Sequence, residues 1–293
     1  MSATADLYVA YLDLRWHFDP AAATAQGIST RDEQLADYTP ERIREHLSAF
    51  KAIAGALEQL EVEDPQEEID RTAFLSELRN TIARFERERP HVHDPSFWLG
   101  HLYGAFQSLL RRRDDAPRDK ARGLLGRLKA TPGFLRAARE TVKDPPRVFL
   151  DTAQALADAG PRLLAEVAQA ARDSDPDFAG AVEDALGEAE SALSRFGLAL
   201  HSELRAHPDD LSFAIGEEQF NRRLHHEHAL QAGAPELYRY GLHLADEIEA
   251  EVATLARQID PTVSWRTVVE RLRSDTAPGP DLAWALRESG DIL

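Results

Sequence analysis

The chain has 293 residues, of which 43% are hydrophobic and 29% charged, so it can bury a substantial core. Its formal net charge of -17 excludes a general nucleic-acid binder and a protein that binds anionic membranes, because both need a positive field. The absence of cysteine excludes disulfides, thiolate zinc sites and cysteine nucleophiles.

The N-terminus carries an acid where a secretory signal needs bases, and the chain has no run of about 20 apolar residues. We therefore expect a cytoplasmic protein with no membrane and no nucleic acid among its partners. The excess of arginine over lysine is typical of a GC-rich bacterial genome.

A capping residue followed by proline recurs along the chain and predicts helix starts. The Asp or Thr oxygen accepts an unpaired backbone N–H, and proline at the first helical position loses only a donor that had no partner. Seven pairs follow this pattern: Thr39-Pro40, Asp64-Pro65, Asp94-Pro95, Thr131-Pro132, Asp144-Pro145, Asp175-Pro176 and Asp260-Pro261.

Apolar residues between these pairs keep to one helical face, as Ile43, Leu47, Phe50 and Leu57 do. No segment alternates like a strand, and Asn-Gly and Asp-Gly hairpin turns are missing. We predict an all-α, multi-helix layered or bundle architecture with about ten to twelve helices and no significant sheet. The expected helices cover residues 4–18, 40–60, 65–88, 95–112, 116–130, 132–143, 145–172, 176–206, 216–230, 235–259, 263–273 and 280–289.

The domain prediction is one helical domain over residues 1–293. A subdomain seam is expected near 207–216, where a long loop separates two predicted helices. Pro145-Pro146 and Gly160-Pro161 leave open a break or kink within 145–172. No fixed repeat period occurs, which argues against a repeat array.

Motifs for chemistry are mostly missing. No nucleophile elbow, phosphate loop or Gly-x-Gly-x-x-Gly turn is present. Zinc peptidases of the His-Glu-x-x-His type need two histidines four apart on one helical face. Here His226-Glu227 is followed by His228-Ala229-Leu230, so leucine stands where the second zinc ligand is required.

His225 and His228 could still share a helical face and, with Glu227 or a distant carboxylate, bind zinc or another divalent metal. The alternative is a solvated polar helix end, where histidine also interacts favourably with the helix dipole. The second interpretation is favoured, so no catalytic, cofactor-binding or metal-binding residue is assigned.

Two arrangements resemble the Glu-x-x-His motif of di-iron bundles, with charged surface as the alternative. The first is Glu88 with His91, which has a proline between its members, and the second is His243 with Asp246 and Glu247.

The basic segment 111–122 could meet an anionic ligand or partner, although such a run is more often a helix end and the start of the next helix, with its aspartates pairing the arginines in solvent. The aromatic group Phe97, Trp98, Tyr103 and Phe106 indicates core packing, with Trp98 turned partly away, or else an aromatic-lined groove.

Ordered blocks along the chain resemble bacterial domain-of-unknown-function family 885. They are Tyr11-Leu-Asp-Leu-Arg-Trp-His-Phe-Asp-Pro20, Ala23-Thr24-x-x-Gly27, Leu35-Ala-Asp-Tyr-Thr-Pro40, Arg127-Leu128-x-x-x-Pro132-x-x-Leu135 before Pro145-Pro146, Ala214-Ile-Gly-Glu-Glu-x-Phe220 with Leu224, Glu236-Leu237-x-x-x-Gly241, and Ala256-x-x-Ile259-Asp-Pro261 with Trp265. The resemblance covers nearly the whole chain.

The resemblance implies a largely helical, zincin-like metallohydrolase relative, suspected to act on peptides, whose zinc-binding tract lies beyond the region matched here. We expect a non-catalytic module corresponding to the amino-terminal helical half, which binds a ligand or partner, self-associates or complements a catalytic partner half. Such a module would expose apolar surface where the other half docks. The alternative is an enzyme, either a hydrolase or a His/carboxylate metalloenzyme, with a site not recognisable from sequence.

Overall fold

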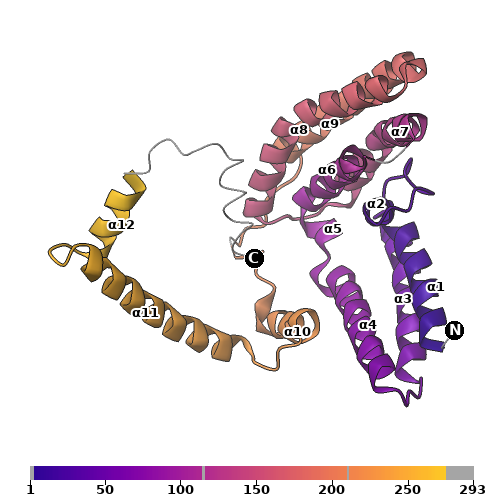
Figure 1. Cartoon of the computed structure of the whole chain (residues 1–293). Coiled ribbons are helices and arrows are strands. Elements are labelled where there is room, and N and C mark those ends of the chain that lie inside the picture. Colours follow the sequence, from indigo (N-terminus) through magenta and orange to yellow (C-terminus); the bar gives the residue numbers. More distant parts are fainter. Residues whose placement is uncertain (1–2, 114–115, 210, 275–293) are drawn as a thin grey trace. The chain divides into compact units, whose positions relative to one another are not determined.

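The computed structural model describes residues 3–113, 116–209 and 211–274. Within these ranges every regular element is a helix, which confirms the predicted all-α fold (Figure 1). The helix predicted over 280–289 lies outside the described residues. No helix in the described ranges combines the length and apolar character needed to cross a bilayer.

The chain divides into two compact units, Met1–Ala229 and Leu230–Leu293. The first contains α1 (Ala3–Phe18), α2 (Pro20–Ala25), α3 (Pro40–Glu58), α4 (Pro65–Ala83), the π-helix η1 (Arg84–Glu88), α5 (Pro90–His93), α6 (Pro95–Arg111), α7 (Pro117–Thr141), α8 (Arg147–Ser174), the 3-10 helix η2 (Pro176–Phe178), α9 (Ala179–Ser202) and α10 (Gly216–His228). The second contains α11 (Ala234–Ile259) and α12 (Trp265–Ser274). The expected seam near 207–216 falls inside the first unit, and folding as a single domain stays a prediction.

Several helices begin at the prolines that the sequence indicates. α3, α4 and α6 start at Pro40, Pro65 and Pro95. The Asp94 carboxylate accepts the backbone N–H groups of residues 96 and 97, and the Asp64 carboxylate does the same for residues 66 and 67. These are the N-cap hydrogen bonds that the residue pairs predict.

Thr131-Pro132 is not a helix start, because α7 continues through it from Pro117 to Thr141. The prediction of two helices, 116–130 and 132–143, was therefore wrong. Proline removes one backbone hydrogen bond, but the helix buries Leu128, Phe134 and Leu135 on one face, and this packing holds it together. α8 likewise runs without interruption through Gly160-Pro161.

The remaining Asp-Pro pairs form turns that precede a helix. They are Asp144-Pro145, Asp175-Pro176 and Asp260-Pro261. α8 begins at Arg147, α9 begins after the short η2, and α12 begins at Trp265. Asp175 and Asp260 each accept the backbone N–H of the second residue after themselves. Their carboxylates therefore stabilise the turn and do not cap the main helix directly.

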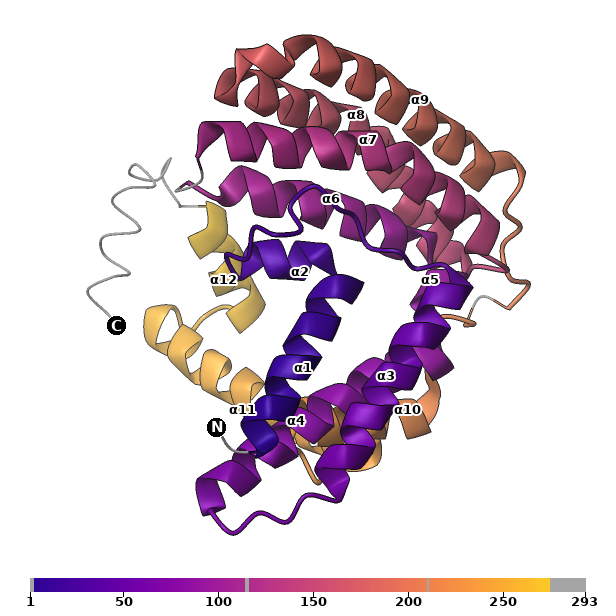
Figure 2. The same cartoon turned by 90° about the vertical axis from the view of Figure 1, so that its right-hand side faces the viewer.

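Helices of the first unit pack in two groups. α6, α7, α8 and α9 lie side by side in one group, and α1, α3 and α4 form the other (Figure 2). The short α2 packs against both α6 and α1, and α10 packs against α4. α2 therefore joins the two groups at the face of α6.

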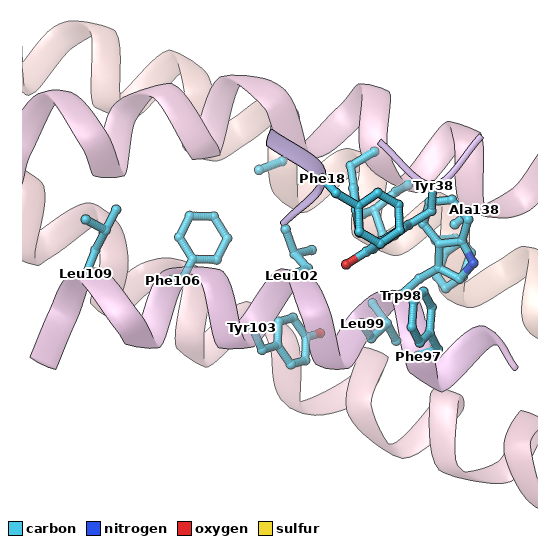
Figure 3. Close-up of a cluster of buried hydrophobic side chains, with 14 of the residues drawn as sticks. Phe18, Tyr38, Phe97, Trp98, Leu99, Leu102, Tyr103, Phe106, Leu109 and Ala138 are labelled. Carbon is cyan, nitrogen blue, oxygen red and sulfur yellow. The ribbon is translucent and has the colours of Figure 1, made fainter. Parts of the chain in front are cut away.

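Aromatic side chains fill the core where the two groups meet (Figure 3). The Tyr38 ring lies 4.9 Å from that of Phe97 and 5.7 Å from that of Trp98, measured between centroids. Trp98 is fully buried and its indole Nε1 donates to the His91 carbonyl at 2.9 Å, so the expectation that it turns partly away was wrong. The buried hydrogen bond lets the whole ring enter the core.

Candidate functional site

A buried arginine organises the region where α2, α6 and α7 meet. The Arg127 guanidinium is fully buried and donates to the Thr24 hydroxyl at 2.6 Å and the Gln34 carbonyl at 3.1 Å. It also donates to the Ala105 carbonyl and, at 3.2 Å, to the Ser108 hydroxyl. Burial lowers the pKa of Arg127 to about 10, so these acceptors must stabilise a cation that the core disfavours.

The same network holds the loop that follows α2. The Thr24 hydroxyl donates to the Asp32 carboxylate at 2.6 Å, and the other Asp32 oxygen pairs with Arg112 at 2.9 Å. The loop lies directly on α7, since a Cβ added at Gly126 would stand 2.6 Å from the Cβ of Glu33. Thr24 and Arg127, which belong to the blocks quoted above, therefore fix α2 against α6.

Between α2 and α6 lies an open groove of about 810 Å³. Ala21 and Ala25 contribute from α2, and Phe97, Gly100 and Gly104 contribute from α6. A Cβ added at either glycine would meet nothing within 4 Å, so the floor of the groove is bare helix backbone. The groove can therefore admit a ligand close to the main chain.

Charged groups of both signs line this groove. The guanidinium groups of Arg84 and Arg111 form no ion pair with any carboxylate in the described part of the chain. Asp19 and Asp94 each use one carboxylate oxygen, Oδ1, to cap a helix. Their other oxygens remain able to accept hydrogen bonds from a ligand.

His101 adds a neutral acceptor to the wall. Its Nδ1 donates to the Phe97 carbonyl at 2.7 Å, and its ring packs 4.1 Å from that of Phe97. Burial lowers the pKa of His101, so the imidazole is neutral near pH 7 and its Nε2 is able to accept a hydrogen bond.

The histidine tract, for which the sequence favours a solvated helix end over a metal site, lies at the end of α10. His225 and His228 are exposed, and the Glu227 carboxylate lies 4.0 Å from the Arg223 guanidinium. Burial lowers the pKa of His226, and its Nδ1 has no hydrogen-bond partner among the described residues. In the described ranges, no three His, Asp or Glu side chains lie close enough together to hold a metal ion.

The two di-iron-like arrangements belong to different units of the chain. Glu88 binds Arg222 at 2.8 Å and also Arg223, and the left-handed residue Arg89, with φ 50°, separates it from His91. Because of this break, Glu88 and His91 do not share a helical turn. In the second arrangement, His243 Nε2 lies 3.3 Å from the Glu247 carboxylate.

The basic segment 111–122 contributes Arg111 and Arg112 to the groove, while Arg118 and Arg122 pair with aspartates. Sequence reasoning missed Asp19 and His101. The Asp19-Pro20 pair has the same capping pattern as the seven pairs of the sequence analysis and indicates a helix start at α2.

The fold and this site define a class of helical protein that carries a charged groove where two groups of helices meet. The chain belongs to the family described as bacterial protein of unknown function (DUF885), which matches residues 20–289. This confirms the family resemblance drawn from the ordered blocks.

One solved structure, described as "a putative lipoprotein of unknown function from Shewanella oneidensis", is similar, with a TM-score of 0.74 and 19% sequence identity. The match covers 96% of this chain and 50% of that chain, so this chain spans half the length of that protein. At this identity the likeness shows the fold alone. Comparison with curated proteins gave no match.

Proposed function

We propose that the chain is a non-catalytic helical module that binds an extended oligopeptide of mixed charge in the groove between α2 and α6. The observation that carries the proposal is the lining of the groove. Arg84 and Arg111, which have no ion pair with a described residue, and the second carboxylate oxygens of Asp19 and Asp94 flank a floor of bare backbone. The zincin-like relationship, the role as an amino-terminal half and the cytoplasmic location stay predictions.

The length of the groove suits a short peptide. Along α6 the lining residues run from Ser96 to Arg111. At the rise of an α-helix this is a span of about 22 Å. An extended chain covers that span with about six or seven residues.

The side chains of the groove match the groups of a peptide. Arg84 and Arg111 would attract carboxylates, while the free oxygens of Asp19 and Asp94 would attract amines or basic side chains. The Nε2 of His101 can accept a backbone N–H. The glycine floor leaves room for the peptide backbone itself.

The test is enrichment of synthetic random-sequence hexapeptides on the immobilised protein, with the bound peptides identified by mass spectrometry. Gly104→Leu fills the floor of the groove, and Gly55→Leu is the matched control, because its Cβ also meets nothing within 4 Å but it lies on α3. We expect wild type and Gly55→Leu to enrich the same peptides, and Gly104→Leu to lose at least about tenfold in affinity.

Two results would overturn the proposal. One is a wild-type protein that enriches no hexapeptide over a blank support, and the other is undiminished enrichment by Gly104→Leu. A further variant, Arg84→Gln with Arg111→Gln, should select fewer acidic peptides and leave the fold unchanged, because both arginines are exposed.

A further inference from the structure

Helix α11 carries an apolar stripe along its whole length. The stripe members follow one another at steps of three and four residues, which keeps them on one face of the helix. They are Leu237, Tyr240, Leu244, Ile248, Val252, Leu255 and Ile259. At the rise of an α-helix the stripe is about 33 Å long.

Most of this stripe is exposed in the second unit. The exposed fraction is 61% for Tyr240, 50% for Ile248 and 62% for Ile259. α12 covers a neighbouring face of α11, where Ala256 and Val268 are buried. An exposed apolar stripe of this length is a kind of surface that proteins use to contact another polypeptide.

The border of the stripe is acidic over its central part, while Arg239 and Arg257 stand near its two ends. Between Tyr240 and Ala256 every Asp, Glu, Lys or Arg side chain is an acid: Asp246, Glu247, Glu249 and Glu251. Glu247 and Glu251 lie one turn apart beside the stripe, and Glu251 has no ion pair with a described residue. Glu249 is already held by Arg266, at 3.2 Å, on the side that faces α12.

This charge pattern selects the kind of partner. Two copies of α11 packed through their stripes would bring acidic borders together, in chains that each carry a net charge of -17. A partner with basic residues beside its own apolar stripe would instead pair with Glu247 and Glu251. The border therefore disfavours self-association and favours a basic amphipathic helix.

We propose that the apolar stripe of α11 docks an amphipathic helix of another protein, and that this helix carries lysine or arginine beside its apolar face. The helix-in-groove and helix-on-helix contacts of proteins use the same spacing of anchors. The inference is independent of the groove between α2 and α6, since no residue is shared.

The test uses the full chain and two fluorescent synthetic helices of roughly 22 residues, which match the length of the stripe. Both peptides carry the same leucine and isoleucine stripe, bordered by lysine in one and by glutamate in the other. Fluorescence anisotropy near physiological salt should show the lysine-bordered peptide binding about tenfold or more tightly than the other.

Variants separate the docking face from general attraction to an acidic protein. Ile248→Asp should abolish binding, whereas Ala250→Asp, on the opposite face of α11, should preserve it. Replacing both Glu247 and Glu251 by lysine reverses their charge and should make the glutamate-bordered peptide the tighter binder. Replacing both Glu188 and Glu190 of α9 by lysine makes the same change in net charge, but the lysine-bordered peptide should still bind more tightly, as it does to wild type.

Three outcomes would overturn the proposal. The first is equal binding of the two peptides or binding of neither, and the second is inversion by the α9 reversals. The third is a wild-type dimer in light scattering that Ile248→Asp dissociates, because the face would then serve a second copy of this chain.

Discussion

Replacement of Arg127 by methionine tests whether the buried guanidinium network fixes α2 against α6. Methionine keeps most of the side-chain volume and removes all the donors. The Gln34 carbonyl loses its guanidinium partner, the Thr24 hydroxyl loses a donor, and Asp32 loses a nearby cation. The loop after α2 would then be held mainly by the pair of Asp32 with Arg112.

The magnitude follows from the acceptors that are left behind. Each buried acceptor without a donor costs about 1 to 3 kcal/mol. Burial of the Arg127 cation is itself unfavourable, since it lowers the pKa of Arg127 to about 10. Removing this cation therefore offsets part of the cost. We expect Arg127→Met to lower the free energy of unfolding by about 2 to 4 kcal/mol, because buried neutral acceptors lose their donor while a disfavoured buried cation is removed.

Urea denaturation followed by circular dichroism measures this change through the transition midpoint at constant slope. The matched control is Arg136→Met, an exposed arginine on the same helix, which should change stability by less than about 0.5 kcal/mol. A loss below about 1 kcal/mol for Arg127→Met would refute the reasoning, since the acceptors would then have found other partners.

Further predictions concern helix packing and pH. Gly160→Ala should destabilise the protein by about 2 kcal/mol or more, because the new Cβ would stand 2.2 Å from the Tyr103 hydroxyl. Gly197→Ala should instead stabilise it by up to about 1 kcal/mol, because the new Cβ would make an ordinary contact with Ala157 at 3.7 Å. Both changes are read from thermal or urea unfolding, and equal effects would contradict the packing argument. Burial lowers the pKa of His91 to about 4, so the unfolded state binds more protons between pH 4 and 6.5. Stability should therefore fall by about 3 kcal/mol as the pH decreases through this window, and His91→Leu should lose that part of the pH dependence.

The helical fold could be predicted because its signals are local. Asp64 and Asp94 cap helices through bonds to residues two and three positions later, so their pattern is visible in a short window. Pro132 shows the limit of such reasoning, because the buried face of α7 outweighs a local break that the pair Thr131-Pro132 would otherwise make.

The groove could not be predicted in the same way. Asp19, Arg84 and His101 come from distant parts of the sequence. They meet only because α2 packs on α6 and because Arg84 of η1 lies over the Phe97 ring of α6. The Asp19-Pro20 pair did signal α2, but a six-residue helix has too few turns to show an apolar period. Gly104 has no sequence signal that separates an open floor from a tight helix contact.

The Arg127 network also has a consequence for the order of folding. It ties Arg127 to Thr24 across 103 residues and to Gln34 across 93, whereas α8 and α9 are neighbours both in the chain and in space. Contacts between sequence neighbours close short loops and form first, while long-range contacts wait for the chain entropy to be overcome. The helices α6 to α9 should therefore assemble early and leave the glycine face of α6 uncovered until α2 arrives, which makes completion of the groove a late folding event.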